Sequence, residues 1–191
     1  MKSLRLTIIL AALGILAASS YSLAQEWGPE IQVTNSLADD RNAAVAFDGI
    51  YVWVFWDREV SGEKQIFYRI KNVDGQWIQN EEQLTFGPGT NSHPITSPNY
   101  FGPPMAVCWE HGTAPNRDVQ LAYRFVNTWS SIYSVFSLTG DEYNPSISLA
   151  RDYQVWHYVY FIIITAQTDN SVVVKHYIEF ADTLSLFERF M

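Results

Sequence analysis

Alternating runs of apolar and polar residues recur along the chain, and a polar turn interrupts each of them. The clearest example spans residues 51–69, where an aromatic run ends in Trp56-Asp57 and a second alternating run follows the polar turn. Two alternating runs around such a turn predict a β-hairpin. Less regular copies occupy residues 105–124 and 155–175. The chain is therefore predicted to be built from repeats.

The repeat extends beyond the hairpin. Trp27, Trp77 and Trp129 recur at intervals of about 50 residues, and each precedes a segment that ends in Thr, such as Glu30–Thr34. A polar turn, a short strand and then the hairpin follow each segment. We predict three units of four short strands, with boundaries at residues 27–76, 77–128 and 129–179.

Three sets of hairpin residues fix the expected register. Because side chains alternate along a strand, two sets should share the buried face and the basic set should point the other way. The first two sets are Ile66, Leu121 and Val172, and Tyr68, Tyr123 and Val174; the basic set is Arg69, Arg124 and Lys175.

The composition favours an all-β fold with a sizeable core. Hydrophobic residues make up 48% of the chain, aromatic residues 15% and charged residues 17%. Aromatic residues are strand formers, and no long stretch has helical spacing. The single cysteine, Cys108, has no partner for an internal disulfide and is predicted to be a small core residue.

The first 24 residues are typical of a secretory signal peptide. Lys2 and Arg5 precede an apolar run, and Ser22-Leu23-Ala24 offers small residues for cleavage before Gln25. The alternative is an uncleaved anchor, but the apolar run is short for a bilayer. We predict a secreted, periplasmic or cell-surface protein with no membrane span after signal removal.

The charge balance excludes one class of partner. Removal of Lys2 and Arg5 from the 12 basic residues leaves 10 against 20 acidic residues. An acidic surface repels nucleic acid and anionic membranes, so neither is predicted as a partner.

The order of these elements resembles the blades of sialidase-like (BNR-type) β-propellers in exported bacterial proteins. The resemblance covers about residues 25–180 and rests on the Trp, Leu-Thr, Trp-Asp and Tyr-Arg positions of each unit. The family's Asp-box appears only as a shortened remnant at residues 72–77, which keeps Asp74, Gly75 and Trp77. The resemblance implies a partial propeller of about three four-stranded blades.

Three units are too few for closure, because closed propellers have about four or more blades. We therefore expect a truncated piece of a longer propeller, an irregular or truncated tail at residues 181–191, and self-association through open blade edges. The alternative architecture is a tandem pair of β-sandwich modules.

Two strand-end acids, Asp57 and Glu110, each follow a tryptophan. Glycoside hydrolysis uses paired carboxylates, which makes them candidate catalytic groups. The structural interpretation is favoured, in which each acid accepts backbone N–H bonds in the following turn, because the acid recurs at matched positions. A similar argument assigns the basic set to surface or inter-blade pairing rather than to a sialidase-type arginine cluster.

The favoured function is non-catalytic binding of a glycan or protein ligand. Candidate ligand-binding residues in loops are Arg58, Tyr100, Phe101 and His111. No catalytic residue, metal site or cofactor is predicted. The alternatives are a sialidase-like glycoside hydrolase fragment and a structural segment of a larger exported protein.

Overall fold

A computed structural model describes residues 28–99, 105–125, 127–136, 138–154, 157–180 and 183–189. The chain divides into two compact units, residues 1–32 and 33–191. Within the first, residues 28–32 contain no strand, and the predicted signal peptide lies outside the described residues. The remaining description concerns the second unit.

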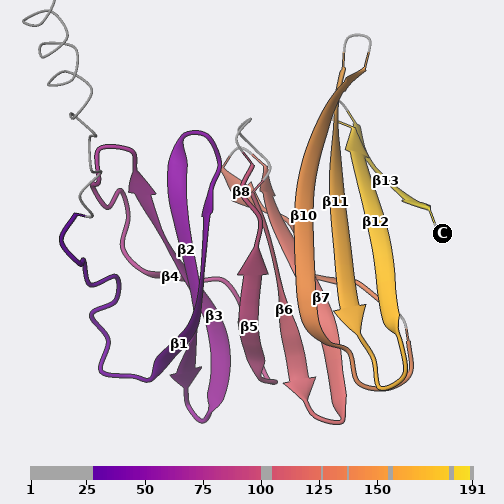
Figure 1. The fold of residues 1–191 in the computed structure, drawn as a ribbon. Coiled ribbons are helices and arrows are strands. Elements are labelled where there is room, and N and C mark those ends of the chain that lie inside the picture. The colour runs from indigo at the N-terminus through magenta and orange to yellow at the C-terminus, as the bar shows by residue number, and fades with distance from the viewer. Residues whose placement is uncertain are drawn as a thin grey trace, which may run out of the picture. The chain divides into compact units, whose positions relative to one another are not determined.

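All regular structure in the described residues is β-strand, in three antiparallel sheets that follow one another along the chain (Figure 1). This confirms the all-β prediction and the expected number of units of about four strands, although the second sheet has five. The first sheet contains β1 (Asp40–Phe47), β2 (Tyr51–Val60), β3 (Glu63–Asn72) and β4 (Glu82–Gln83). The second contains β5 (Asn91–Thr96), β6 (Met105–Thr113), β7 (Asn116–Phe125), β8 (Thr128–Trp129) and β9 (Tyr133–Ser134). The third contains β10 (Tyr143–Gln154), β11 (His157–Gln167), β12 (Val172–Phe180) and β13 (Thr183–Arg189).

Each sheet is a meander, in which consecutive strands are hydrogen-bonded neighbours. In the second sheet the two-residue strands β8 and β9 both pair with β7. The turn between β2 and β3 is Ser61-Gly62, with φ of 56° and 87°. Two positive φ values are what a two-residue type I′ hairpin requires, so the predicted hairpin forms around its glycine.

The second sheet is buried on both faces, which explains the uninterrupted apolar run at its centre. Alternate residues of β6 enter two different cores: Met105, Val107 and Trp109 pack against the first sheet, and Ala106 and Cys108 pack against the third. Because one sheet contributes to both cores, the three sheets form a continuous stack. Tandem β-sandwich modules would instead have two separate cores.

The sheets do not coincide with the predicted repeat units. The segment ending in Leu84-Thr85 was expected to open the second unit, but its first residues form β4 and complete the first sheet. Likewise, β9 completes the second sheet. The equivalent Glu30–Thr34 segment forms no strand in this chain. A short outer strand needs the edge of the preceding sheet as its partner, so each sheet begins later than its repeat.

The predicted hairpin register is wrong by two residues. Ile66 lies opposite Asp57, whereas Val119 lies opposite Glu110, so Val119 and not Leu121 corresponds to Ile66. A two-residue shift keeps the same face of a strand. Ile66, Tyr68, Leu121 and Tyr123 are therefore buried as predicted.

The third member of each apolar set departs from the prediction. Val172 is 67% exposed and Val174 is 52% exposed. Both lie on the face of β12 that would meet a following sheet, and no following sheet is present among the described residues. The sequence pattern is that of a buried strand, but burial also requires a neighbour.

The tail is more regular than expected. Thr183–Arg189 forms β13, which pairs with β12 between His176 and Phe180. The edge of β12 continues the meander, so this segment has a partner although it lacks the repeat's Trp and Leu-Thr pattern. Among the described residues, no helix has the length and apolar character needed to cross a membrane.

Candidate functional site

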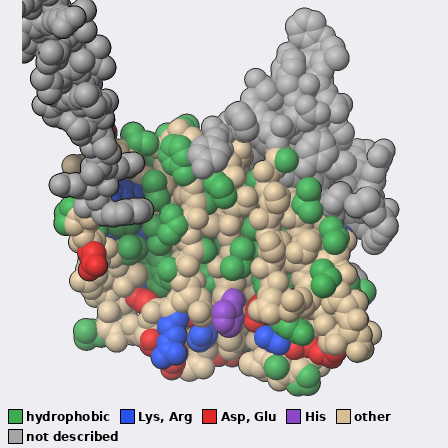
Figure 2. All heavy atoms as spheres, viewed as in Figure 1, with side chains coloured by type: hydrophobic (Ala, Val, Ile, Leu, Met, Phe, Trp, Pro, Cys, Tyr) green, Lys and Arg blue, Asp and Glu red, His purple; other side chains and the backbone are tan. Residues whose placement is uncertain are grey.

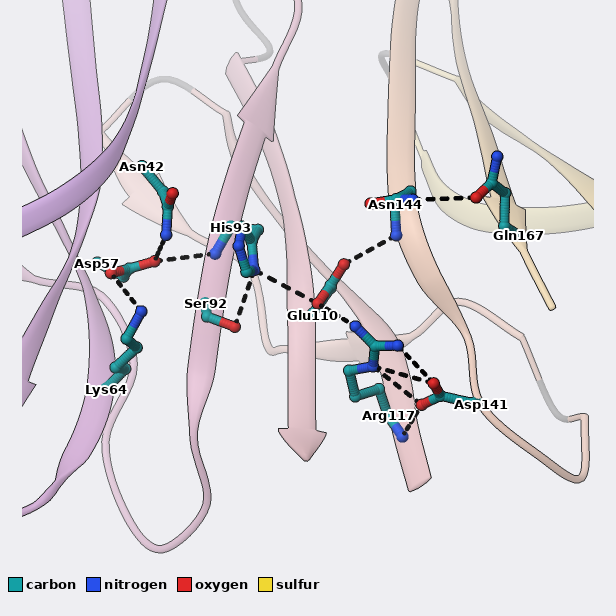
Figure 3. Close-up of polar contacts among 10 residues, drawn as sticks. All are labelled: Asn42, Asp57, Lys64, Ser92, His93, Glu110, Arg117, Asp141, Asn144 and Gln167. Carbon is teal, nitrogen blue, oxygen red and sulfur yellow. Dashed lines mark hydrogen bonds and ion pairs between the residues drawn. The ribbon is translucent and has the colours of Figure 1, made fainter. Parts of the chain in front are cut away.

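A row of polar side chains runs across the ends of all three sheets (Figure 3). In the first strand of each sheet one non-glycine residue has a positive φ: Asn42 at 52°, His93 at 54° and Asn144 at 48°. Each lies where the register with the second strand shifts. We call these three residues and the second-strand residues Asp57, Glu110 and Gln167 the polar ladder. Figure 2, which has the view of Figure 1, shows charged and histidine side chains gathered along its lower edge.

Asp57 links the first two sheets. Its carboxylate is fully buried, and Oδ2 accepts hydrogen bonds from the Asn42 side-chain amide (2.7 Å) and from the backbone N–H of His93 (3.0 Å). Lys64 Nζ lies 3.2 Å from Oδ1. One acid thus holds the first strand of its own sheet and the first strand of the next.

Glu110 repeats this arrangement between the second and third sheets. Its Oε1 accepts the backbone N–H of Asn144 at 2.8 Å, and Arg117 Nη1 lies 3.1 Å from Oε2. Arg117 also donates to both carboxylate oxygens of Asp141, with the shortest contact at 2.5 Å. These hydrogen bonds lower the pKa of Asp141 and raise that of Arg117.

The predicted hydrogen-bond partner of the two acids is wrong, although both acids do accept backbone N–H groups. In each case the N–H belongs to the first strand of the neighbouring sheet and not to the turn that follows the acid. The constant spacing of Asn42, His93 and Asn144 was an available signal. Asn and His adopt positive φ more readily than most residues.

Arg58 and His111, two of the predicted ligand-binding residues, occupy matched positions in successive sheets. Arg58 donates from Nε and Nη2 to the Asp40 carboxylate (2.5 and 2.8 Å), and His111 Nδ1 lies 3.0 Å from Asn91 Oδ1. Each therefore contacts the first strand of its own sheet, and the structure does not gather the two into one site. Tyr100 and Phe101 lie outside the described residues.

A surface pocket of about 380 Å³ lies beside Arg58. It is lined by Asn35, Ser36, Arg58, Arg69, Asn80 and Glu81. Arg58 stacks over the Phe67 ring, with Cζ 4.6 Å from the centroid, and is also paired with Glu81 at 2.7 Å. Burial opposes ionisation of Asp40, but hydrogen bonds from Arg58 and its neighbours prevail and lower the Asp40 pKa.

Arg69 is the second guanidinium of the pocket, and it is held differently. Its Nη1 donates to the Val33 carbonyl oxygen at 2.8 Å, and Cζ lies 4.4 Å from the centre of the Trp77 ring. Within the described part of the chain, no carboxylate lies in ion-pair distance of Arg69. The sequence placed Arg69 in the basic set, but only the fold brings it beside Arg58. Arg124 of that set stacks on Trp53 of the neighbouring sheet, an inter-sheet contact of the predicted kind.

Cys108 is a core residue, as predicted. Its side chain is fully buried between the second and third sheets, and burial raises the pKa of the thiol to about 12. A thiol with so high a pKa carries almost no thiolate at neutral pH, and the thiolate is the nucleophilic form.

No protein-family model matches the chain, and no curated protein matches it. Two solved structures are similar at 14% identity over 86% of the chain. One is a subtype N10 neuraminidase-like protein of A/little yellow-shouldered bat/Guatemala/060/2010 (TM-score 0.44, 47% of that protein covered). The other is a neuraminidase-like protein from A/bat/Guatemala/164/2009 (TM-score 0.45, 44% covered). The chain spans about half the length of either structure.

Proposed function

We propose that this chain is a non-catalytic binding module of the propeller type, and that the pocket beside Arg69 takes a carboxylate-bearing saccharide. The proposal rests on a difference between the pocket's two guanidinium groups in their carboxylate partners. Arg58 is neutralised by Asp40 and Glu81, whereas Arg69 has no carboxylate within ion-pair distance among the described residues.

The rest of the pocket suits a sugar. Asn35, Ser36, Asn80 and Glu81 supply donors and acceptors for hydroxyl groups. Arg69 donates from Nε to the Gln79 carbonyl oxygen and from Nη1 to the Val33 carbonyl oxygen, so its Nη2 is the group that can donate to a carboxylate. Stacking on Trp77 restricts the Arg69 side chain before a ligand arrives, which reduces the entropy lost on binding.

The alternative of a sialidase-like hydrolase finds little support in the two strand-end acids. A glycosidase needs one carboxyl group to protonate the leaving oxygen and a second to attack or to activate water. Asp57 and Glu110 are buried, belong to different sheets, and accept backbone N–H bonds from the next sheet. Both join sheets, and neither lines the pocket beside Arg58.

A glycan-binding comparison tests the proposal. The purified chain should bind saccharides that carry sialic or uronic acids and should bind their neutral analogues at least tenfold more weakly. Arg69→Gln should remove that preference, and the exposed Arg41→Gln serves as a matched control with the same charge change. Equal binding of acidic and neutral glycans, or an unchanged preference in Arg69→Gln, would refute the site.

Two further measurements address activity and location. A fluorogenic sialoside should not be turned over, and turnover that disappears in Asp57→Asn would establish the hydrolase instead.

We also propose that the module acts after export, on the basis of the leader-like first 24 residues. Mass spectrometry of the exported chain should find Gln25 at its N-terminus; an intact Met1 on the exported chain would contradict cleavage.

A further inference from the structure

At each end of the polar ladder, one group lacks the inter-sheet hydrogen-bond partner that its equivalents have among the described residues. In the third sheet Gln167 takes the place of Asp57 and Glu110, and its Oε1 accepts the Asn144 side-chain amide at 2.9 Å. Asp57 and Glu110 also each accept a backbone N–H from a following sheet, but Gln167 is exposed and receives none within the described residues. At the other end, no carboxylate among those residues reaches the backbone N–H of Asn42.

Two valines of β12 are uncovered on the outer face of the third sheet. Val172 and Val174 correspond in register to Val119 and Leu121 of the second sheet, which are 0% and 1% exposed because the third sheet packs over them. The two valines are 67% and 52% exposed. The face therefore has the character of one that packs against a following sheet.

Among the described residues, the third sheet lacks a short closing strand beside Val172, and a segment that could supply such a strand lies near the first sheet. In the first sheet Leu84 N–H donates to Ile66 O at 2.7 Å, and in the second Val135 N–H donates to Val119 O at 2.8 Å. The corresponding acceptor in the third sheet is Val172 O, but β13 pairs only between His176 and Phe180. The corresponding donor is Val33, which belongs to no strand.

We propose that a second copy of this chain fills both positions, so that the third sheet of each copy packs on the first sheet of the other. Gln167 Oε1 of one copy then accepts the Asn42 N–H of the other, and Val33 N–H donates to Val172 O of the other. Head-to-tail contacts close into a ring when the rotation allows it. With three sheets among the described residues of each copy, two copies supply six, within the range of about four to eight blades for closed propellers, whereas one copy supplies too few and three copies too many.

This assembly leaves the rim of the pocket open but covers Arg69, because Arg69 corresponds in register to Ala122, which is fully buried between the first and second sheets. In register, Phe86 corresponds to Asn35 and Ile132 corresponds to Glu81. Phe86 and Ile132 lie at the junction of the first and second sheets, whereas Asn35 and Glu81 lie beside the first sheet. Phe86 is 73% exposed and Ile132 is 43% exposed although that junction is fully packed. A junction between two copies should be open at this rim only, so the dimer and a ligand bound at Arg69 exclude each other, and the Val174→Lys monomer is the form in which saccharide binding is measured.

Light scattering coupled to size exclusion tests the assembly in the absence of any glycan. The chain at tens of micromolar should have twice its single-chain mass, and Val174→Lys should return it to a monomer because a buried charge would be unpaired. Val73→Lys changes a valine of similar exposure, 69%, in the turn after β3 and should remain dimeric. A monomeric wild-type chain, a larger oligomer, or a Val174→Lys chain of unchanged mass would overturn the proposal.

Hydrogen exchange then separates head-to-tail pairing from simple contact between two third sheets. The Val33 amide should be protected in the wild-type dimer and should exchange freely in Val174→Lys. A dimer that Val174→Lys disrupts but that leaves Val33 unprotected would show that the two apolar faces meet each other, which contradicts the proposed ring.

Discussion

The carboxylate of Asp57 in the first sheet accepts a hydrogen bond from the backbone N–H of His93 in the second, with 3.0 Å between Oδ2 and N. The same oxygen accepts the Asn42 side-chain amide. A buried acceptor shared by two sheets should contribute more to stability than a surface charge does, because its loss leaves one donor from each sheet without its partner.

Asp57→Ala is expected to lower the free energy of unfolding by about 1–3 kcal/mol, since it leaves a backbone N–H without its acceptor. Urea denaturation measures the change. Glu59→Ala on the same strand, at an exposed position, should change stability by no more than about 0.5 kcal/mol. Equal effects of the two substitutions would show that Asp57 does not join the sheets.

Phe55→Ala is expected to lower the free energy of unfolding by about 3–5 kcal/mol. Phe55 is fully buried and lies within an aromatic cluster with Trp53, Tyr68 and Trp129, with ring centres about 6 Å apart. Phe86→Ala at a 73% exposed position is the control and should cost less than about 0.5 kcal/mol. Thermal or urea unfolding of both variants decides the matter, and a comparable loss in Phe86→Ala would contradict the described core.

Glu142→Gln is expected to stabilise the protein at neutral pH. Burial raises the pKa of Glu142, and Oε2 accepts the Val119 N–H at 3.2 Å, a bond that the amide oxygen of Gln can keep. A raised pKa means that the folded state favours the protonated acid, so its stabilising effect is complete below the unfolded pKa, near 4.5, and is lost as pH rises through the folded pKa.

The melting temperature of Glu142→Gln should therefore exceed that of the wild type at pH 7.5 and match it near pH 3.5. Asp74→Asn, in an exposed turn, removes a charge without removing a buried one and is the control. A neutral-pH melting temperature at or below the wild-type value would argue against a buried carboxylate at this position.

Arg117→Met is expected to destabilise the fold at neutral pH, and this effect should diminish in acid. Hydrogen bonds from Arg117 lower the pKa of Asp141, so the pair stabilises the folded state above the ordinary Asp pKa of 3.8 and loses that effect as pH falls through the lower folded value. The stability difference between wild type and variant should be largest at neutral pH and should shrink as the solution is acidified below about pH 4.

Denaturation curves at several pH values test this, with Arg41→Met as the control. The Arg41–Asp39 pair is 64% and 52% exposed, so solvent and salt screen it and its loss should matter less. A difference for Arg117→Met that stays constant down to pH 2 would exclude the Asp141 linkage.

Sequence reasoning could find the two acids of the polar ladder, but it could not find which residues line the pocket. The recurrence of an acid after Trp56 and Trp109 indicated a structural role, because every repeat needs the same junction. The pocket depends on Val33, Arg58 and Arg69 meeting from distant segments, and no local pattern encodes that meeting. Arg58 and His111 looked alike as loop candidates, yet each is held by the first strand of its own sheet.

The sequence by itself determined the strands, the hairpins and the number of units, since alternation, aromatic content and a two-residue turn such as Ser61-Gly62 act within a few residues of one another. Only the tertiary structure decided which sheet each outer strand joins and which apolar faces are covered. Val172 and Leu121 both alternate like buried residues, but burial comes from a neighbouring sheet, and that neighbour is a property of the whole fold and its assembly.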